Sequence, residues 1–265
     1  MQRTGVKFLR RMALIGIAIF AGIGKRAYFL VNALASMWRE PRTYFPLIIR
    51  QMRSIGVDSL VLTGIVAAFI GSVIALQTRY QLFPGVQLSV VGLIVRQSIV
   101  LELGPLLTGL VLTGRVGARM TAEIGTMRVT EQIDALESLG RSPVTHLLLP
   151  RILAGVIAIP ALVMLANAFG IIVGYITAQS SLGLTYADFE FGARYFFRPL
   201  DLWYSLVKSY AFAGAVTIIP CYIGFNTQQG AEGVGRATTQ AVVASSVTVL
   251  FLDTILTKLI LGTAK

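Results

Sequence analysis

The chain has very little of the chemistry on which most enzyme sites are built. Among its 265 residues there is one cysteine, Cys221, and one histidine, His146. A single cysteine excludes a disulfide framework, and the sequence offers no Cys/His cluster for zinc. It also lacks an H-E-x-x-H motif and a G-x-x-x-x-G-K-[ST] phosphate-binding loop. We therefore expect no catalytic residues, no metal and no cofactor in this chain.

Charged residues are scarce as well. They make up 13% of the chain, against 55% for hydrophobic residues, and the mean hydropathy is +0.75. Several apolar runs exceed the ~20 residues that cross a bilayer, so the composition indicates an all-α polytopic membrane protein. The net charge of +11 does not indicate nucleic acid, because charge alone specifies no partner. We expect no nucleic acid partner.

The first 53 residues are basic and begin like a signal peptide. An apolar run of 13 residues, Met12–Gly24, follows the basic start, but Lys25 and Arg26 come next instead of a small-residue cleavage site. Thirteen residues are too few to span a bilayer, so we expect a helix lying in the cytoplasmic interface. A short extra span is the alternative. Residues 1–55 are thus predicted to form a basic interfacial region and residues 56–265 the membrane domain.

Five later segments are long and apolar enough to cross the membrane. They cover about residues 57–80, 88–112, 151–178, 201–225 and 238–261. With the N-terminus in the cytoplasm, the inner segments hold 16 Lys and Arg residues and the outer segments hold four. This positive-inside bias predicts a cytoplasmic N-terminus and a C-terminus on the opposite side.

A polar segment, residues 117–142, separates the second and third spans on the predicted cytoplasmic side. Small residues recur there at four-residue spacing, which on a helix lets another backbone approach closely. The two series are Thr113, Gly117, Thr121 and Gly125, and beside them Gly114, Ala118 and Ala122. The second span is therefore predicted to continue below the membrane as a tightly packed helix.

A short amphipathic helix is predicted next, at about residues 127–139. Thr130 is suited to start it, and Gly140 and Pro143 to end it. Acidic and apolar side chains alternate at helical spacing along it: Glu131, Asp134 and Glu137 repeat every three residues, and Ile133 and Leu136 share another side. A helix held in this way between two long spans is placed to transmit a push from a soluble partner.

Several stretches of the sequence resemble the MlaE/YrbE-type permeases of ATP-binding-cassette lipid transporters. They stand in family order and extend over nearly everything after residue 55. They are "FIGSVIALQ" (Phe69–Gln77), "ELGPLLTGLVLTGRVGARMTAEIGTMRVTEQIDAL" (Glu102–Leu136), "PRILA" (Pro150–Ala154), "LVKS" (Leu206–Ser209) and "GVGRATTQAVV" (Gly233–Val243). The first 50 residues match only in character.

The resemblance implies a multi-pass protein of the bacterial inner membrane with a periplasmic C-terminus. It implies a permease homodimer bound to two cytoplasmic ATPase subunits, which would use ATP and Mg, and to an outer MCE-domain lipid-binding protein. The cargo would be phospholipid or a related lipid. The helix at 127–139 would dock into the ATPase, through Arg128, Glu131, Ile133, Asp134, Leu136 and Glu137. Family cavities lie chiefly between the first, second and last spans, which implies that Gln77, Glu102 and "VTVLFLD" (Val247–Asp253) lie near the lipid.

Ionisable residues at membrane depth are functional candidates by default. Glu102 lies two residues before Gly104 and three before Pro105, and a proline unable to donate to the Leu101 carbonyl predicts a kinked or opened helix here. Glu102 is therefore expected to contact a polar headgroup or to satisfy a local hydrogen bond. Asp253 needs a partner. It is expected either to contact a residue of a neighbouring span or to take part in transport.

The remaining charges within the spans have two interpretations. For Arg96, snorkelling outward and a contact with lipid phosphate are both open. For Lys208 and Lys258, snorkelling to the outer interface is the preferred account.

Two other functions remain open at this stage. One is a self-sufficient secondary carrier or channel that uses Glu102 and Asp253 as ion or proton sites. The other is a scaffold that only anchors an outer lipid-binding protein. Neither requires an ATPase partner, and the permease interpretation does.

Overall fold

A computed structural model describes residues 41–83, 85–228 and 230–262, and helices dominate these residues, with no strand among them. The α-helices are α2 (Pro41–Met52), α3 (Asp58–Gln81), α4 (Val90–Ser98), α5 (Gly104–Leu112), α6 (Ala118–Val129), α7 (Gln132–Ser138), α8 (Leu149–Leu182), α9 (Tyr186–Arg194), α10 (Pro199–Phe225) and α11 (Ala231–Gly262). The interfacial helix predicted at residues 12–24 lies outside the described residues.

Four π-helical turns join some of these helices end to end. They are η1 (Arg53–Val57), η2 (Ile99–Leu103), η3 (Thr113–Gly117) and η4 (Val144–Leu148). A π turn holds one more residue than an α-turn and is frequent at functional sites. Here η1 joins α2 to α3, η2 and η3 join α4, α5 and α6, and η4 leads directly into α8. The result is three continuous helical rods.

Within the described residues, five helical rods are long and apolar enough to cross a membrane, which confirms the predicted all-α polytopic fold. They are Tyr44–Gln81, Val90–Val129, Val144–Leu182, Pro199–Phe225 and Ala231–Leu259. The second has 40 residues, or about 60 Å at ~1.5 Å per residue, about twice the thickness of the hydrocarbon core. The prediction that this span continues as a helix past about residue 112 is therefore confirmed.

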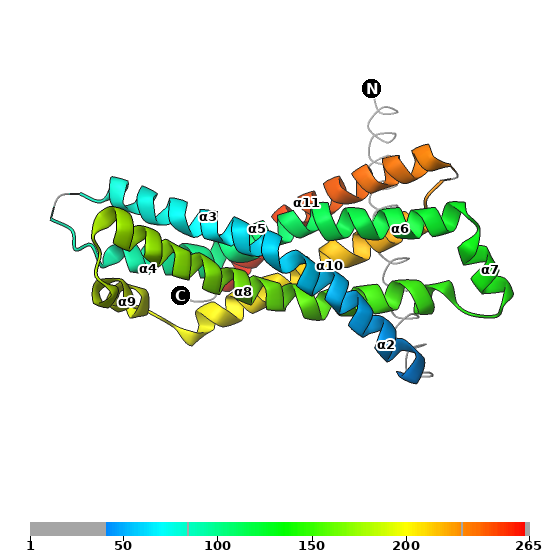
Figure 1. Ribbon diagram of the computed structural model, residues 1–265, viewed down its shortest axis with the longest axis horizontal. Coiled ribbons are helices and arrows are strands. Elements are labelled where there is room, and N and C mark those ends of the chain that lie inside the picture. Colours follow the sequence, from blue (N-terminus) through cyan, green and yellow to red (C-terminus); the bar gives the residue numbers. More distant parts are fainter. Residues whose placement is uncertain (1–40, 84, 229, 263–265) are drawn as a thin grey trace, which may run out of the picture.

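The molecule is elongated, with the rods roughly along its long axis (Figure 1). The short helices α7 and α9 lie at opposite ends, so they belong to opposite sides of a membrane that the rods cross (Figure 1). The connection between α8 and α10 contains α9, and its exposed aromatic side chains include Tyr186, Phe191, Tyr195, Phe196 and Phe197.

Glycines bring the backbones of α3 and α8 into direct contact. A Cβ atom on Gly71 would lie 1.9 Å from the carbonyl oxygen of Gly170, and one on Gly174 would lie 3.1 Å from that of Gly71. Only glycine fits such an approach.

The first predicted series of small residues, in η3 and α6, packs in a similar way against α10. A Cβ atom on Gly117 would lie 3.1 Å from Pro220 Cγ, and Thr121 Oγ1 donates to the Pro220 carbonyl at 3.2 Å. The second series does not share this contact, since nothing lies within 4 Å of a Cβ on Gly114.

Candidate functional site

The second rod changes its winding at the predicted break. The π turn η2 ends at Leu103, and α5 begins at Gly104 with Pro105 in its first turn. Because Pro105 has no N–H, the Leu101 carbonyl loses its helical donor. Lys208 of α10 supplies the replacement, since its Nζ donates to the Leu101 oxygen at 3.1 Å. The irregular turn thus recruits a cation into the membrane interior.

Lys208 is the centre of a buried ion cluster made by three rods. Its side chain is 3% exposed, and its Nζ lies 2.5 Å from Glu102 Oε2 and 2.9 Å from Asp253 Oδ1. Thr257, one turn after Asp253 on α11, donates to Glu102 Oε1 at 3.3 Å. We call Glu102, Lys208, Asp253 and Thr257 the Lys208 cluster.

The snorkelling preferred for Lys208 is therefore wrong. The side chain is buried, and its ammonium lies against two carboxylates and the Leu101 carbonyl instead of reaching the interface. Lys258, one residue after Thr257, is exposed. The same cluster gives Asp253 the partner on a neighbouring span that its sequence position required.

The Lys208 cluster carries an excess of negative charge, since one ammonium faces two carboxylates. Asp253 is nearly buried, with 11% of its side chain exposed, whereas 38% of the Glu102 side chain is exposed. The exposed part of Glu102 therefore presents the excess charge to the surroundings. This arrangement favours a positively charged or hydrogen-bond-donating group at that point.

Arg96 belongs to a different buried pair. Its Nη1 donates to Asp201 Oδ2 of α10 at 2.8 Å, and its guanidinium lies 5.4 Å from the centroid of the Phe197 ring. Since the residue is only 5% exposed, the outward snorkelling considered for it is wrong. The pair joins the second and fourth rods, and a contact of Arg96 with lipid phosphate remains a prediction.

Gln77 is exposed, in the last two turns of α3. No hydrogen bond joins it to the Lys208 cluster among the described residues. Its predicted role near the lipid is thus independent of the cluster. In the described part of the chain no group of three His, Cys, Asp or Glu side chains is arranged to hold a metal ion.

The segment predicted as one helix at 127–139 is divided by a sharp corner. α6 runs to Val129, and Glu131 adopts a left-handed backbone with φ of 60° before α7 begins at Gln132. Arg128 Nη1 lies 2.6 Å from Asp134 Oδ1 across this corner. Gly140, with φ of 70°, ends α7 as predicted.

The corner decides which side chains of α7 face outward. Ile133 is completely buried and belongs to the same buried apolar cluster as Ile124 and Leu148. The prediction that Ile133 offers an apolar contact to a partner is therefore wrong. Leu139 is 76% exposed and Leu136 half-buried, so these two remain available. Glu131, Asp134 and Glu137 are exposed at the tip of the molecule (Figure 1).

Sequence reasoning missed Lys208 and Thr257 as members of the site. A signal was present, because a lysine in the middle of an apolar rod is costly unless paired. The partner of a buried charge cannot be read from spacing when it lies about a hundred residues away, as Glu102 does.

The comparisons with known proteins agree with this architecture. Residues 48–259 match the family described as Permease MlaE. A probable ABC transporter permease protein of Rickettsia bellii is 39% identical over 245 residues, which cover 92% of this chain and 93% of that protein.

Two further relatives have more specific names. The intermembrane phospholipid transport system permease protein MlaE of Haemophilus influenzae is 34% identical over 258 residues, 97% of this chain and 98% of that protein. The chloroplastic protein TRIGALACTOSYLDIACYLGLYCEROL 1 of Arabidopsis thaliana is 32% identical over 209 residues, 78% of this chain and 59% of that protein. Matches that run through all five membrane rods make the chain a member of the MlaE permease family.

Proposed function

We propose that this chain is the membrane-spanning subunit of an ATP-driven transporter that moves phospholipid between membranes. The observation that carries the proposal is the near full-length match to a permease of an intermembrane phospholipid transport system, with 97% of the chain aligned. The five membrane rods provide the scaffold such a subunit needs. Hydrolysis of ATP, with its Mg, belongs to a separate cytoplasmic ATPase, because this sequence has no phosphate-binding loop.

The Lys208 cluster supports a role in contacting the lipid. It lies in the membrane interior, it carries an excess negative charge, and part of Glu102 is exposed. A polar headgroup that passes this point meets a carboxylate whose position is fixed by Lys208 and Thr257. Glu102 thus acts as the lipid-facing residue, and Asp253 acts through Lys208.

The shape of α7 supports an ATPase contact. Three exposed acids and the exposed Leu139 surround a helix whose Ile133 is anchored in the permease core. A partner that binds this tip pushes on α6 through the short corner at Glu131, which the Arg128–Asp134 ion pair holds in place. Arg128 takes part indirectly, since it positions Asp134.

The remaining partners follow from the family. Exposed apolar side chains on α11, among them Val243, Val247 and Phe251, suit contact with lipid or with a second copy of the chain. The end that carries α9 faces the periplasm, where an MCE-domain protein would assemble. The N-terminus is then cytoplasmic, the C-terminus periplasmic, and the membrane is the bacterial inner membrane.

A self-sufficient carrier or channel is less well supported. Such a protein would use Glu102 and Asp253 as ion sites, yet Lys208 already occupies the space between the two carboxylates. No observation favours the scaffold over the permease.

Reconstitution tests the proposal directly. The permease, its ATPase and its MCE-domain partner are purified together and placed in liposomes with a fluorescent phospholipid. ATP-dependent movement of the lipid to acceptor membranes is the expected result. The matched control is an ATPase variant that binds but does not hydrolyse ATP. Equal lipid movement without the ATPase would favour a carrier, and equal movement without this chain would favour a scaffold.

A further inference from the structure

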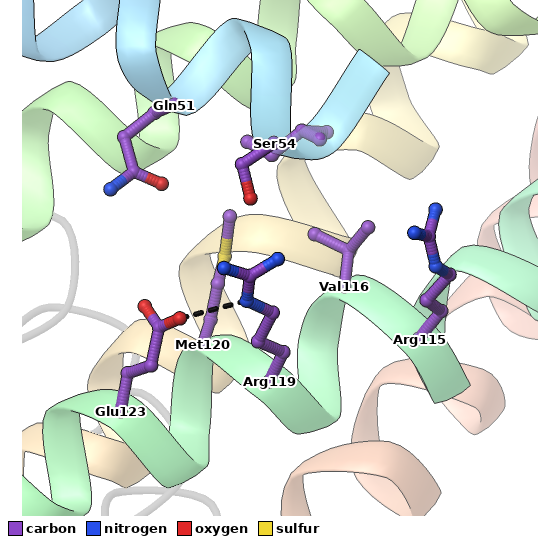
Figure 2. A pocket seen from close by; sticks show the side chains of 8 residues that line it. Gln51, Ser54, Arg115, Val116, Arg119, Met120 and Glu123 are labelled. Carbon is purple, nitrogen blue, oxygen red and sulfur yellow. Dashed lines mark hydrogen bonds and ion pairs between the residues drawn. The ribbon is translucent and has the colours of Figure 1, made fainter. Parts of the chain in front are cut away.

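A pocket outside the Lys208 cluster lies near the predicted cytoplasmic surface of the membrane. Figure 2 shows Gln51 and Ser54 on one wall, with Arg115 and Arg119 among the side chains of the facing wall. The space between the two walls is about 300 Å³ when the solvent at its open side is included. The remaining lining residues are Ile55, Val116, Met120 and Glu123. Two helical rods that are distant in sequence thus enclose two guanidinium groups and two neutral polar side chains.

The pocket lies where two π turns face each other. Ser54 belongs to η1 and Arg115 to η3. After Ser54 the chain exposes apolar residues, with Val57 at the end of η1 and Val61 and Ile65 in α3. Before Ser54 stand the basic residues Arg50 and Arg53. This change from apolar to basic surface places the pocket at the depth of lipid headgroups.

The charges around the pocket do not balance. Arg119 is shared between Glu123, at 2.8 Å, and Asp58, at 3.9 Å. Glu123 also meets Arg151, at 3.2 Å. Arg115 has no ion pair among the described residues, so three arginines meet two carboxylates.

One donor in this group has no acceptor. The Nη1 atom of Arg115 is buried, and no hydrogen-bond partner for it occurs in the described part of the chain. A buried charged donor without an acceptor is costly, so an acceptor from another molecule would be stabilising at this point.

We propose that this pocket binds a phosphate group, with Arg115 as its principal donor and Arg119, Ser54 and Gln51 as its neighbours. A phosphate supplies both the missing negative charge and the missing acceptor, and guanidinium groups match its oxygen geometry. The group could be carried by a lipid of the cytoplasmic leaflet or be free inorganic phosphate. The apolar residues of α3 beside the pocket favour the lipid, since they offer a surface for its acyl chains. The inference depends on the membrane position of the rods and not on transport.

Lipid binding to the purified full-length chain tests the site. Native mass spectrometry in detergent would measure the affinity for phosphatidylglycerol, with diacylglycerol of the same acyl chains, which has no phosphate, as the comparison. Arg115→Gln should weaken phosphatidylglycerol binding about tenfold or more, as loss of a charge-assisted hydrogen bond implies. Arg141→Gln is the matched control, because it removes the same charge from an exposed loop residue at the same end of the molecule, and it should leave the affinity unchanged.

A second variant tests the charge deficit without removing the arginine. Ser54→Asp introduces a carboxylate on the wall that faces Arg115. It should raise the melting temperature of the lipid-free protein and weaken phosphatidylglycerol binding, because the new carboxylate takes the place of the phosphate. A Ser54→Asp protein that binds phosphatidylglycerol as tightly as the unaltered chain would count against the site.

Thermal unfolding separates the two sources of phosphate. Phosphatidylglycerol should raise the melting temperature of the unaltered chain, and the increase should be lost in Arg115→Gln. If inorganic phosphate gives the same Arg115-dependent increase at constant ionic strength, the site is a phosphate site whose ligand is the free ion. If neither ligand distinguishes Arg115→Gln from Arg141→Gln, the proposal is overturned.

Discussion

Arg128 and Asp134 form an ion pair across the corner between α6 and α7. Their closest atoms lie 2.6 Å apart, on either side of the left-handed residue Glu131. The pair therefore fixes the direction in which α7 leaves the rod below the membrane. Because both side chains are partly exposed, its contribution to folding stability is small, and its value lies in orientation.

Reversing the exposed acids of α7 should release the ATPase. The Glu131→Lys, Asp134→Lys double variant replaces attraction by repulsion at the proposed contact, so the affinity should fall by about two orders of magnitude or more. Retention of the ATPase on the purified permease measures this. Because Asp134→Lys also breaks the Arg128 pair, Glu131→Lys, Glu137→Lys serves as a second variant that leaves the corner pair intact.

The control for this experiment is charge reversal elsewhere at the same end. Glu232→Lys changes an acid that is exposed and pairs only with its neighbour Arg236 among the described residues, and it should retain the ATPase. Full ATPase binding and stimulation by both double variants would rule out α7 as the contact.

Glu131 can be used to separate backbone strain from charge. A non-glycine residue in the left-handed region costs about 1–2 kcal/mol, so Glu131→Gly should raise the free energy of unfolding by about 1 kcal/mol. Glu131→Val should lower it, because a β-branched side chain fits this conformation least well. Thermal unfolding of the three proteins checks the order. A Glu131→Gly protein less stable than the original would show that φ is not the controlling factor.

Removing the charge of Lys208 should be among the most harmful single substitutions. Lys208→Met keeps the length of the side chain but leaves two carboxylates near each other in the membrane interior, which should cost about 3–5 kcal/mol. The triple variant Lys208→Met, Glu102→Gln, Asp253→Asn removes all three charges and should recover much of the stability. Thermal unfolding in detergent measures both, with Lys258→Met as the exposed control. Equal stability of the single and triple variants would contradict the pairing.

A substitution of Glu102 tests lipid contact and should change folding stability less than the Lys208 variants do. Glu102→Gln retains a hydrogen-bonding group for Thr257 and Lys208 but removes the charge that faces the surroundings. We expect normal assembly with the ATPase and reduced phospholipid recovered with the complex. Thin-layer chromatography of the bound lipid quantifies the reduction. A variant that fails to assemble would instead assign Glu102 a structural role.

The predicted orientation can be tested by cysteine labelling. Cys221 is completely buried, and its replacement by alanine gives a background without thiols. In that background, Ser181→Cys near α9 should react with an impermeant maleimide added to intact spheroplasts, and Glu137→Cys on α7 should react only after lysis. The reverse pattern would overturn both the orientation and the ATPase contact.

The number of membrane rods could be predicted because hydropathy is a local property. Each membrane-spanning segment can be recognised from its own length and apolar residues, without knowledge of the other segments. The ends of the rods were harder to predict than their number. The first rod begins at Tyr44, whereas the predicted span began near residue 57. The stretch between them contains charged and polar residues, so it lowers the hydropathy while still forming helix. Local composition does not distinguish where the helix ends from where the membrane ends.

The contents of the site were only half predictable. Glu102, Pro105 and Asp253 attract notice as rare residue types at membrane depth. That Lys208 joins them depends on how α10 is rotated against two other rods, which a single sequence does not express. Ile133 shows the same limit, because its apolar character was correctly identified. Only the corner at Glu131 decides that this side chain turns inward.

The glycine contact between α3 and α8 determines which part of the protein is stiff. Two backbones that touch at Gly71 and Gly170 leave no side chains between them to rearrange, so these rods move as a single frame. In contrast, only 17% of the apolar stretch of the last rod is buried within the described protein, against 44% for the third. The Lys208–Asp253 ion pair therefore joins a rod that is largely exposed in this chain to the interior of the protein.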